Sequence, residues 1–289
     1  MAERGTAVRV DPVSGVREEI TFFGERSPLM FCALHLPKGE VNAAVISCPS
    51  VHAELIKSYR KDAMLAKALA AIGVAVIRYH YRGEGNSEGA VGELNLDAMI
   101  ASVDEARSEL ARRTGVDRFG YHGTRLGSFP AAAACEADPG APLLLWAPLP
   151  DTDVFVRELI RTHYIAALKG EDKPEPTARL IERVMEEGEI ELVGHVISRD
   201  LYTSLQGRRL DSYRPKGSSV MLTPYGPQNL DDLVAAWDAA GASVTVFGES
   251  ADEEAWWLAG DAAQPEDGQE RVMTLVSASA AWLLEQLTG

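Results

Sequence analysis

Short apolar runs alternate with helical patterns along most of the chain. Residues 16–37 alternate apolar and polar positions around a short polar turn, which predicts a β-hairpin. Buried strands are predicted at 42–49, 74–81, 117–123 and 141–148, where short apolar runs are bounded by turn residues. Helices are predicted between them at about 57–72, 95–113 and 128–137. This order predicts a parallel sheet with helices on both faces.

The pattern changes between residues 151 and 215. DVFVRELIRTHYIAALKG is amphipathic, GEDKPEP has the composition of a loop, and PTARLIERVMEEG predicts a second helix. The strand–helix order then resumes, with strands at 218–226 and 242–248, a helix at 230–241 and a last helix at 269–287. We therefore expect a core made of residues 1–150 and 216–289, with residues 151–215 inserted as a helical cap.

Composition narrows the class of protein. The chain has 289 residues, which suits one large α/β domain with an insertion. Its formal charge of −15 argues against general nucleic-acid binding. No apolar stretch reaches the roughly 20 residues of a membrane span, and MAERGTAVRV lacks the form of a signal peptide. Cys32, Cys48 and Cys135 lie in or beside apolar runs, which predicts buried free thiols in a reducing compartment. We expect a cytoplasmic protein with a small-molecule substrate and without a metal or other cofactor, and a homodimer is compatible with the sequence.

The central motif is Gly123-Thr124-Arg125-Leu126-Gly127, between a predicted strand and a helix of small residues. It resembles the G-x-S-x-G elbow of α/β-hydrolases, with Arg125 in place of the nucleophilic serine. The tract RYHYRGEGNSEG resembles the loop that follows a strand in the same superfamily. The resemblance implies an α/β-hydrolase fold with an inserted cap, and glycines that permit a strained, closely packed turn.

A second resemblance is narrower. CPSVHAELIKSYRKDAMLAKALAAIG is similar to a tract of the exosortase-system-associated hydrolases, which have a Glu followed by a Lys and an Arg, here Glu54, Lys57 and Arg60. VGHVISRDLYTSL and EAWW resemble that subfamily's cap and C-terminal tracts, and its elbow also contains an Arg. The similarity covers about residues 20–285 and implies a link to exopolysaccharide or envelope pathways, by analogy alone.

The three residues of the usual catalytic triad are not all present at their expected positions in this sequence. The acid of a hydrolase follows the strand predicted at 218–226, where Asp231 and Asp232 also suit a helix N-terminus. The histidine normally follows the last strand, but the tract there, ESADEEAWW, contains none. With both Ser and His missing, the relay that generates a nucleophile cannot form at its usual positions.

Other side chains near the predicted elbow could bind or convert a ligand. Arg125 would hold an anion or stabilise developing negative charge, because its guanidinium is a permanently charged planar fork. Glu54 would orient Arg125 or act as a general base, and His52 or His122 would move a proton. Residues predicted to contact the substrate are Lys57, Arg60, Thr124, Trp256 and Trp257.

Each candidate also has a structural interpretation. Arg125 and Glu54 would form a buried ion pair, and His122, like His80, would be a hydrogen-bonded histidine of a buried strand. Lys57 and Arg60 would be solvated on a helix surface, and the two tryptophans would pack under the cap.

These observations lead to three hypotheses about function. The first is a divergent biosynthetic enzyme that acts on a small anionic or acyl/ester-type substrate through Arg125 and Glu54. The second is a pseudoenzyme that binds a ligand or serves as a scaffold. The third is an esterase or thioesterase with a relocated nucleophile, for which Thr124 and Ser50 are the candidates.

Overall fold

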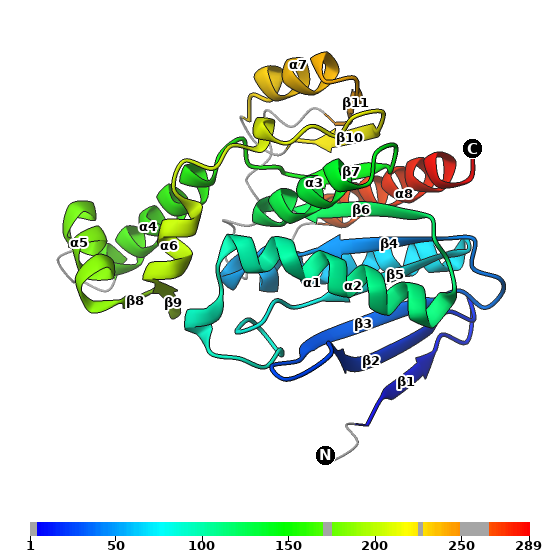
Figure 1. Cartoon of the computed structure of the whole chain (residues 1–289), viewed down its shortest axis with the longest axis horizontal. Helices are drawn as coiled ribbons and strands as arrows, with labels where there is room; N and C mark the ends of the chain where they lie inside the picture. The colour runs from blue at the N-terminus through cyan, green and yellow to red at the C-terminus, as the bar shows by residue number, and fades with distance from the viewer. Residues whose placement is uncertain (1–4, 170–174, 225–227, 249–265) are drawn as a thin grey trace.

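The computed structural model describes residues 5–169, 175–224, 228–248 and 266–289. Within them, the main sheet has the strand order β1-β2-β3-β5-β4-β6-β7-β10-β11 (Figure 1). The strands are β1 Ala7–Val10, β2 Arg17–Phe23, β3 Met30–Leu36, β4 Ala43–Cys48, β5 Val74–Tyr79, β6 Phe119–Thr124, β7 Leu143–Trp146, β10 Ser219–Thr223 and β11 Ser243–Val246. Pairing is antiparallel from β1 through β3 to β5 and parallel from β5 to β11. The prediction of a mostly parallel α/β sheet is confirmed.

Helices cover both faces of the sheet (Figure 1). On one face, α1 (His52–Ala71) and α8 (Glu266–Thr288) pack against the side chains of Val45, Val76 and Leu144. On the other, α2 (Leu96–Thr114), α3 (Ser128–Ala137) and α7 (Asp231–Ala239) bury a second apolar cluster. The central strands therefore have apolar side chains on both faces, as the continuous apolar runs of the sequence predict.

The segment between β7 and β10 forms the cap, which lies beside one end of the sheet (Figure 1). It contains α4 (Thr152–Lys169), α5 (Thr177–Glu187), β8 (Glu189–Leu192), β9 (His195–Ser198) and α6 (Arg199–Leu205). The prediction of a purely helical cap was incomplete, because β8 and β9 pair as an antiparallel hairpin. Its turn is Val193-Gly194, with φ of 53° and 78°, as in a type I′ turn.

The start of one helix and the presence of one strand also differ from the predictions. Helix α1 begins at His52 instead of about Lys57, so His52 and Glu54 lie in its first turn. An acidic residue there is favourable, because the first turn exposes unpaired backbone N–H groups. Strand β1 was not predicted, since its side chains are exposed on both faces and give no amphipathic signal.

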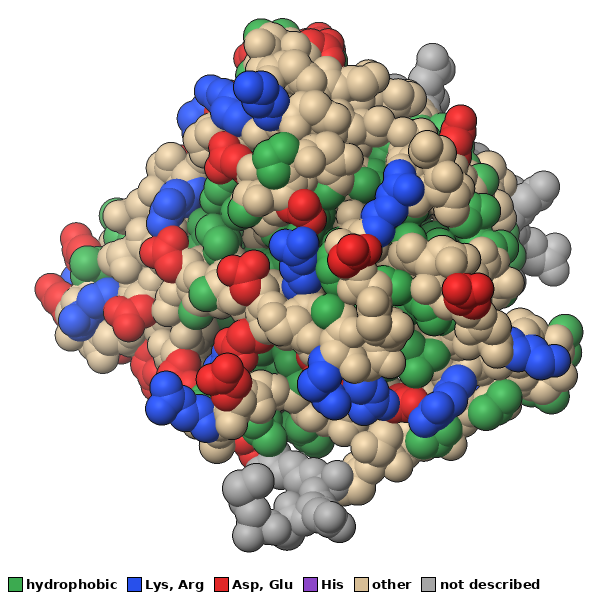
Figure 2. Space-filling view, turned by 45° about the vertical axis from the view of Figure 1, so that its right-hand side comes forward, with side chains coloured by type: hydrophobic (Ala, Val, Ile, Leu, Met, Phe, Trp, Pro, Cys, Tyr) green, Lys and Arg blue, Asp and Glu red, His purple; other side chains and the backbone are tan. Residues whose placement is uncertain are grey.

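The surface is mixed in charge. On the face drawn in Figure 2, acidic and basic side chains are interspersed with apolar ones. Cys32, Cys48 and Cys135 are buried and free, as predicted. Among the described residues, no helix combines the length and apolar character needed to cross a membrane.

Candidate functional site

The elbow lies where β6 ends and α3 is about to begin. Arg125 has a φ of 54°, in the left-handed region that non-glycine residues rarely adopt. A Cβ on Gly127 would meet the Cys48 carbonyl oxygen at 2.1 Å, and one on Gly123 would meet the Gly127 carbonyl oxygen at 2.6 Å. Both glycines are therefore required by close backbone approach, and the strained turn expected from the sequence is present.

The Arg125 side chain is fully buried in an ionic cluster. Its Nε and Nη2 donate to Glu54 Oε1 at 3.1 and 2.9 Å, and Nη2 also donates to Glu158 Oε2 from α4 of the cap. The Ser50 hydroxyl donates to Glu54 Oε2 at 2.5 Å. The cluster thus joins the elbow, the first turn of α1 and the cap. The predicted proximity of Arg125 and Glu54 is observed in the form of the buried ion pair, and their catalytic roles stay predictions.

His52 lies at the same edge of the sheet, held by a different carboxylate. Its backbone N–H and its Nδ1 lie 3.2 and 3.1 Å from the two oxygens of Glu84, in the loop after β5. Its ring stacks on His195 of β9 at 5.1 Å and lies 6.4 Å from the ring of Phe155 on α4. Burial acts to raise the pKa of Glu84, but the hydrogen bonds and charge of His52 outweigh it and lower that pKa below its usual value.

His122 occupies a different environment. Its Nδ1 is 3.0 Å from the Ser47 hydroxyl, and its Nε2 is 3.4 Å from the hydroxyl of Thr124, which donates to Asp62 at 3.0 Å. The ring packs edge-on against Trp146, among the side chains that face α1 and α8. Burial lowers the pKa of His122 to about 3. The prediction of a catalytic His122 has no support in this geometry, which is that of a hydrogen-bonded core histidine.

The other predicted site residues are dispersed. Thr124 belongs to the same buried hydrogen-bond network as His122, and its predicted contact with substrate stays a prediction. Arg60 is exposed on α1, whereas Lys57 is half-buried one turn beyond Glu54. Trp256 and Trp257 lie outside the described residues. His80 is structural, since its Nδ1 accepts the Asn86 N–H at 3.0 Å and burial lowers its pKa to about 4.

Three residues of the site were missed by the sequence analysis. Glu84 lies in the loop tract RYHYRGEGNSEG, for which no role was predicted, although loops at the carboxyl ends of parallel strands converge on one edge. Glu158 and His195 come from the cap, where no sequence pattern indicates which side chains face the core. Asp231 and Asp232 occupy the first turn of α7, as their helix-start interpretation requires.

An apolar pocket lies inside the cap. Its walls are side chains of α4, α5, α6 and the β8–β9 hairpin, and it is partly open to solvent. Helix α4 connects this pocket to the elbow, because Phe155 and Leu159 line the pocket while Glu158 binds Arg125. Among the described residues, no cluster of three or more His, Cys, Asp or Glu has a geometry suited to a metal ion.

The fold and the elbow together define a protein of the α/β-hydrolase fold. No family model matches the sequence, and no curated protein matches it. Est1E from Butyrivibrio proteoclasticus, solved with ferulic acid, is similar in structure, with a TM-score of 0.64 and 15% identity over 93% of this chain and 100% of that one. XC6422 from Xanthomonas campestris, a serine hydrolase without a lid, is similar with a TM-score of 0.58 and 13% identity, over 97% of this chain and 99% of that one. Mouse alpha/beta hydrolase domain-containing protein 10 is similar with a TM-score of 0.57 and 14% identity, over 93% of this chain and 99% of that one. At such identities the likeness establishes the fold alone.

Proposed function

We propose that this protein is a divergent enzyme that acts on a small acyl- or ester-type substrate carrying a negative charge. The main support is the ion pair at the elbow, where the strained Arg125 is shared between Glu54 of the core and Glu158 of the cap. Buried charges and strained backbone each cost stability. Their presence at the edge where such sheets bind ligands favours a functional role.

The two carboxylates play different parts in this proposal. Glu54 is buried and fixed by Ser50, so it holds one side of the guanidinium in place. The Glu158 side chain is 26% exposed and comes from the cap. A substrate carboxylate, or an oxyanion that develops during the reaction, would replace Glu158 at Arg125 Nη2. One anion would be exchanged for another, so no buried charge would be left unpaired.

The cap would supply the remaining recognition. The apolar pocket beside α4 would receive the acyl part of the substrate, since it lies on the helix that contacts Arg125. The resemblance to exosortase-associated hydrolases favours a biosynthetic role in an exopolysaccharide or envelope pathway, by analogy only.

The test compares two esters that differ in charge, p-nitrophenyl butyrate and the mono-p-nitrophenyl ester of succinic acid. Arg125→Ala and Arg125→Lys should each lower kcat/KM for the succinyl ester by about 100-fold, and by much less for the butyryl ester. Glu158→Gln should lower KM for the succinyl ester, because it removes the competing anion. Arg112→Ala, which breaks only a surface pair with Glu109, is the control. Wild-type rates in both Arg125 variants would contradict the proposal.

Two observations keep the alternative functions in the test. The complete burial of Arg125 favours a non-catalytic binding protein, which would bind succinate in calorimetry without turning over either ester. The short Ser50–Glu54 contact favours Ser50 as a relocated nucleophile. In that case Ser50→Ala would abolish turnover of both esters, and mass spectrometry of the wild type would detect an acyl adduct on Ser50.

A further inference from the structure

His52 and Glu84 have the geometry of an acid–base pair. A carboxylate can only accept hydrogen bonds, and Glu84 has a lowered pKa. The proton of a neutral His52 ring must therefore lie on Nδ1, which faces Glu84 at 3.1 Å. Nε2 then carries an unprotonated lone pair, which is the arrangement that a general base requires.

The Nε2 atom of His52 has no hydrogen-bond partner among the described residues, although the side chain is only 4% exposed. A buried acceptor without a partner costs about 1–3 kcal/mol, so such atoms in native proteins call for an explanation. His52 also has a φ of 58°, a second left-handed non-glycine residue at this edge of the sheet. Both features are typical of a side chain that is held ready for a ligand.

The imidazole and the Arg125 cluster contact the same helix. Phe155 lies against the His52 ring, and Glu158 binds Arg125. Residues three apart on a helix are neighbours, with Cβ atoms roughly 5–6 Å apart. A substrate bound at Arg125 beneath α4 would therefore lie close to His52, whose ring also stacks on that of His195.

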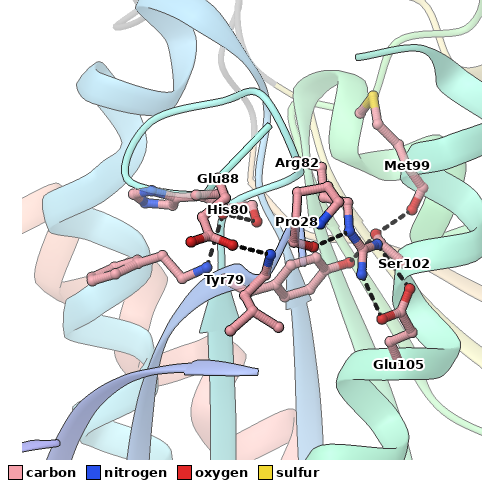
Figure 3. A network of polar contacts seen from close by, with 11 residues as sticks. Pro28, Tyr79, His80, Arg82, Glu88, Met99, Ser102 and Glu105 are labelled. Atoms are coloured by element: carbon pink, nitrogen blue, oxygen red, sulfur yellow. Dashed lines mark hydrogen bonds and ion pairs between the residues drawn. The ribbon is translucent and has the colours of Figure 1, made fainter. Parts of the chain in front are cut away.

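The loop that carries Glu84 is firmly anchored (Figure 3). Arg82 donates to the Pro28 carbonyl at 2.7 Å and to both oxygens of Glu105 at 2.8 and 2.7 Å. Glu88 accepts the Leu29 N–H at 2.7 Å. Because the loop is tied on both sides of Glu84, to α2 and to the residues just before β3, the carboxylate is preorganised to hold the ring.

We propose that His52 is the catalytic general base of this site and that Glu84 is its positioning residue. In the reaction, Nε2 takes a proton from the substrate or from an attacking water, and the resulting imidazolium is stabilised by the Glu84 carboxylate. The same proton then passes from Nε2 to the leaving group, which returns the ring to its neutral form. This assignment rests on the proposed function, because Arg125 holds the anion that lies beside the base.

Nitrogen-15 NMR of histidine-labelled protein tests the pairing without any substrate. The wild type should show His52 with its proton on Nδ1, and Glu84→Gln should lose this preference, because an amide can donate as well as accept a hydrogen bond. Glu84 and His195 contact this ring, and the ring of Phe155 on α4 lies 6.4 Å from it. Glu93→Gln, at an exposed position that follows the same loop, should leave the proton on Nδ1. A proton on Nε2 would overturn the pairing.

Kinetics on the succinyl ester test the catalytic role. His52→Gln should lower kcat by at least about 100-fold, and Glu84→Gln should lower kcat while changing KM much less. His163→Gln on α4 is the imidazole control. Full activity in His52→Gln together with inactive Arg125 variants would overturn this inference and leave the proposed function standing. An inactive His52→Gln variant together with fully active Arg125 variants would contradict the proposed function and support His52 as the base. If the wild type turns over neither ester, the proposed function fails, and the NMR result alone judges the pair.

Discussion

His122 on β6 and Arg125 just after this strand illustrate how the position of a side chain decides its chemistry. His122 and Arg125 are three residues apart, yet His122 faces the core beneath α1 and α8 while Arg125 turns toward the cap. The strand alternates its side chains between faces, and the left-handed φ at Arg125 then redirects the chain. The sequence could predict Arg125 and Glu54 as partners, because they follow adjacent parallel strands. It could not decide between a catalytic and a structural histidine at position 122, since burial and hydrogen bonding make that difference.

The burial of His122 predicts a pH dependence of stability. Its pKa is about 3 in the folded protein, so the ring stays neutral there while the unfolded chain binds a proton below about pH 6.5. The unfolded state therefore binds more protons between about pH 6.5 and 3, and stability falls as the pH drops through this window. Between pH 7 and pH 5, the wild type should lose about 2 kcal/mol more than His122→Gln in urea unfolding. Equal losses in the two proteins would contradict the burial argument, and His163→Gln should behave like the wild type.

At the scale of elements, periodicity was sufficient for the core and insufficient for the cap. The buried strands and the helices between them were predicted close to their observed places, because long apolar patterns are averaged over many residues. The hairpin β8–β9 was not predicted, since each strand has only four residues and β8 begins directly after the amphipathic helix α5. Its turn signal was also weak, because Val193 stands where type I′ turns favour Asn.

This turn offers a stabilising substitution. Val193 is β-branched and has a φ of 53°, which is costly, and its side chain is 40% exposed, so little packing depends on it. Val193→Asn should raise the free energy of unfolding by about 0.5–1 kcal/mol and slow amide exchange in β8 and β9. Val13→Asn, in an exposed turn without a positive φ, is the control. An unchanged or lower stability of Val193→Asn would show that the turn conformation carries no such strain.

At the scale of the molecule, the site depends on contacts between parts that are distant in sequence. The fold could be predicted because the order of strands and helices suffices for it. The sequence could not predict the roles of Glu84, Glu158 and His195, because these roles depend on how one loop and the cap pack on the sheet edge. The cap meets the core through Glu158 on Arg125 and His195 on His52. Both contacts involve residues with a left-handed backbone, so two of the strained positions of the core coincide with its contacts to the cap.

This coincidence raises the question of whether the Arg125–Glu54 pair serves the fold or the chemistry. Arg125→Met alone would leave Glu54 buried without its counter-charge and should cost about 3–5 kcal/mol in urea unfolding. Arg125→Met combined with Glu54→Leu removes both charges and should recover most of that loss, because apolar side chains of similar size often replace buried ion pairs without cost.

The recovered double variant should nevertheless fail to turn over the succinyl ester. The surface pair Arg183→Met with Glu187→Leu in the cap is the matched control and should change neither stability nor activity appreciably. If the double variant stays as unstable as Arg125→Met, the ion pair is needed for folding, and the structural interpretation of the elbow is correct. A stable but inactive double variant would mean that the cluster is kept for function at the expense of stability, as the strained backbone at Arg125 already suggests.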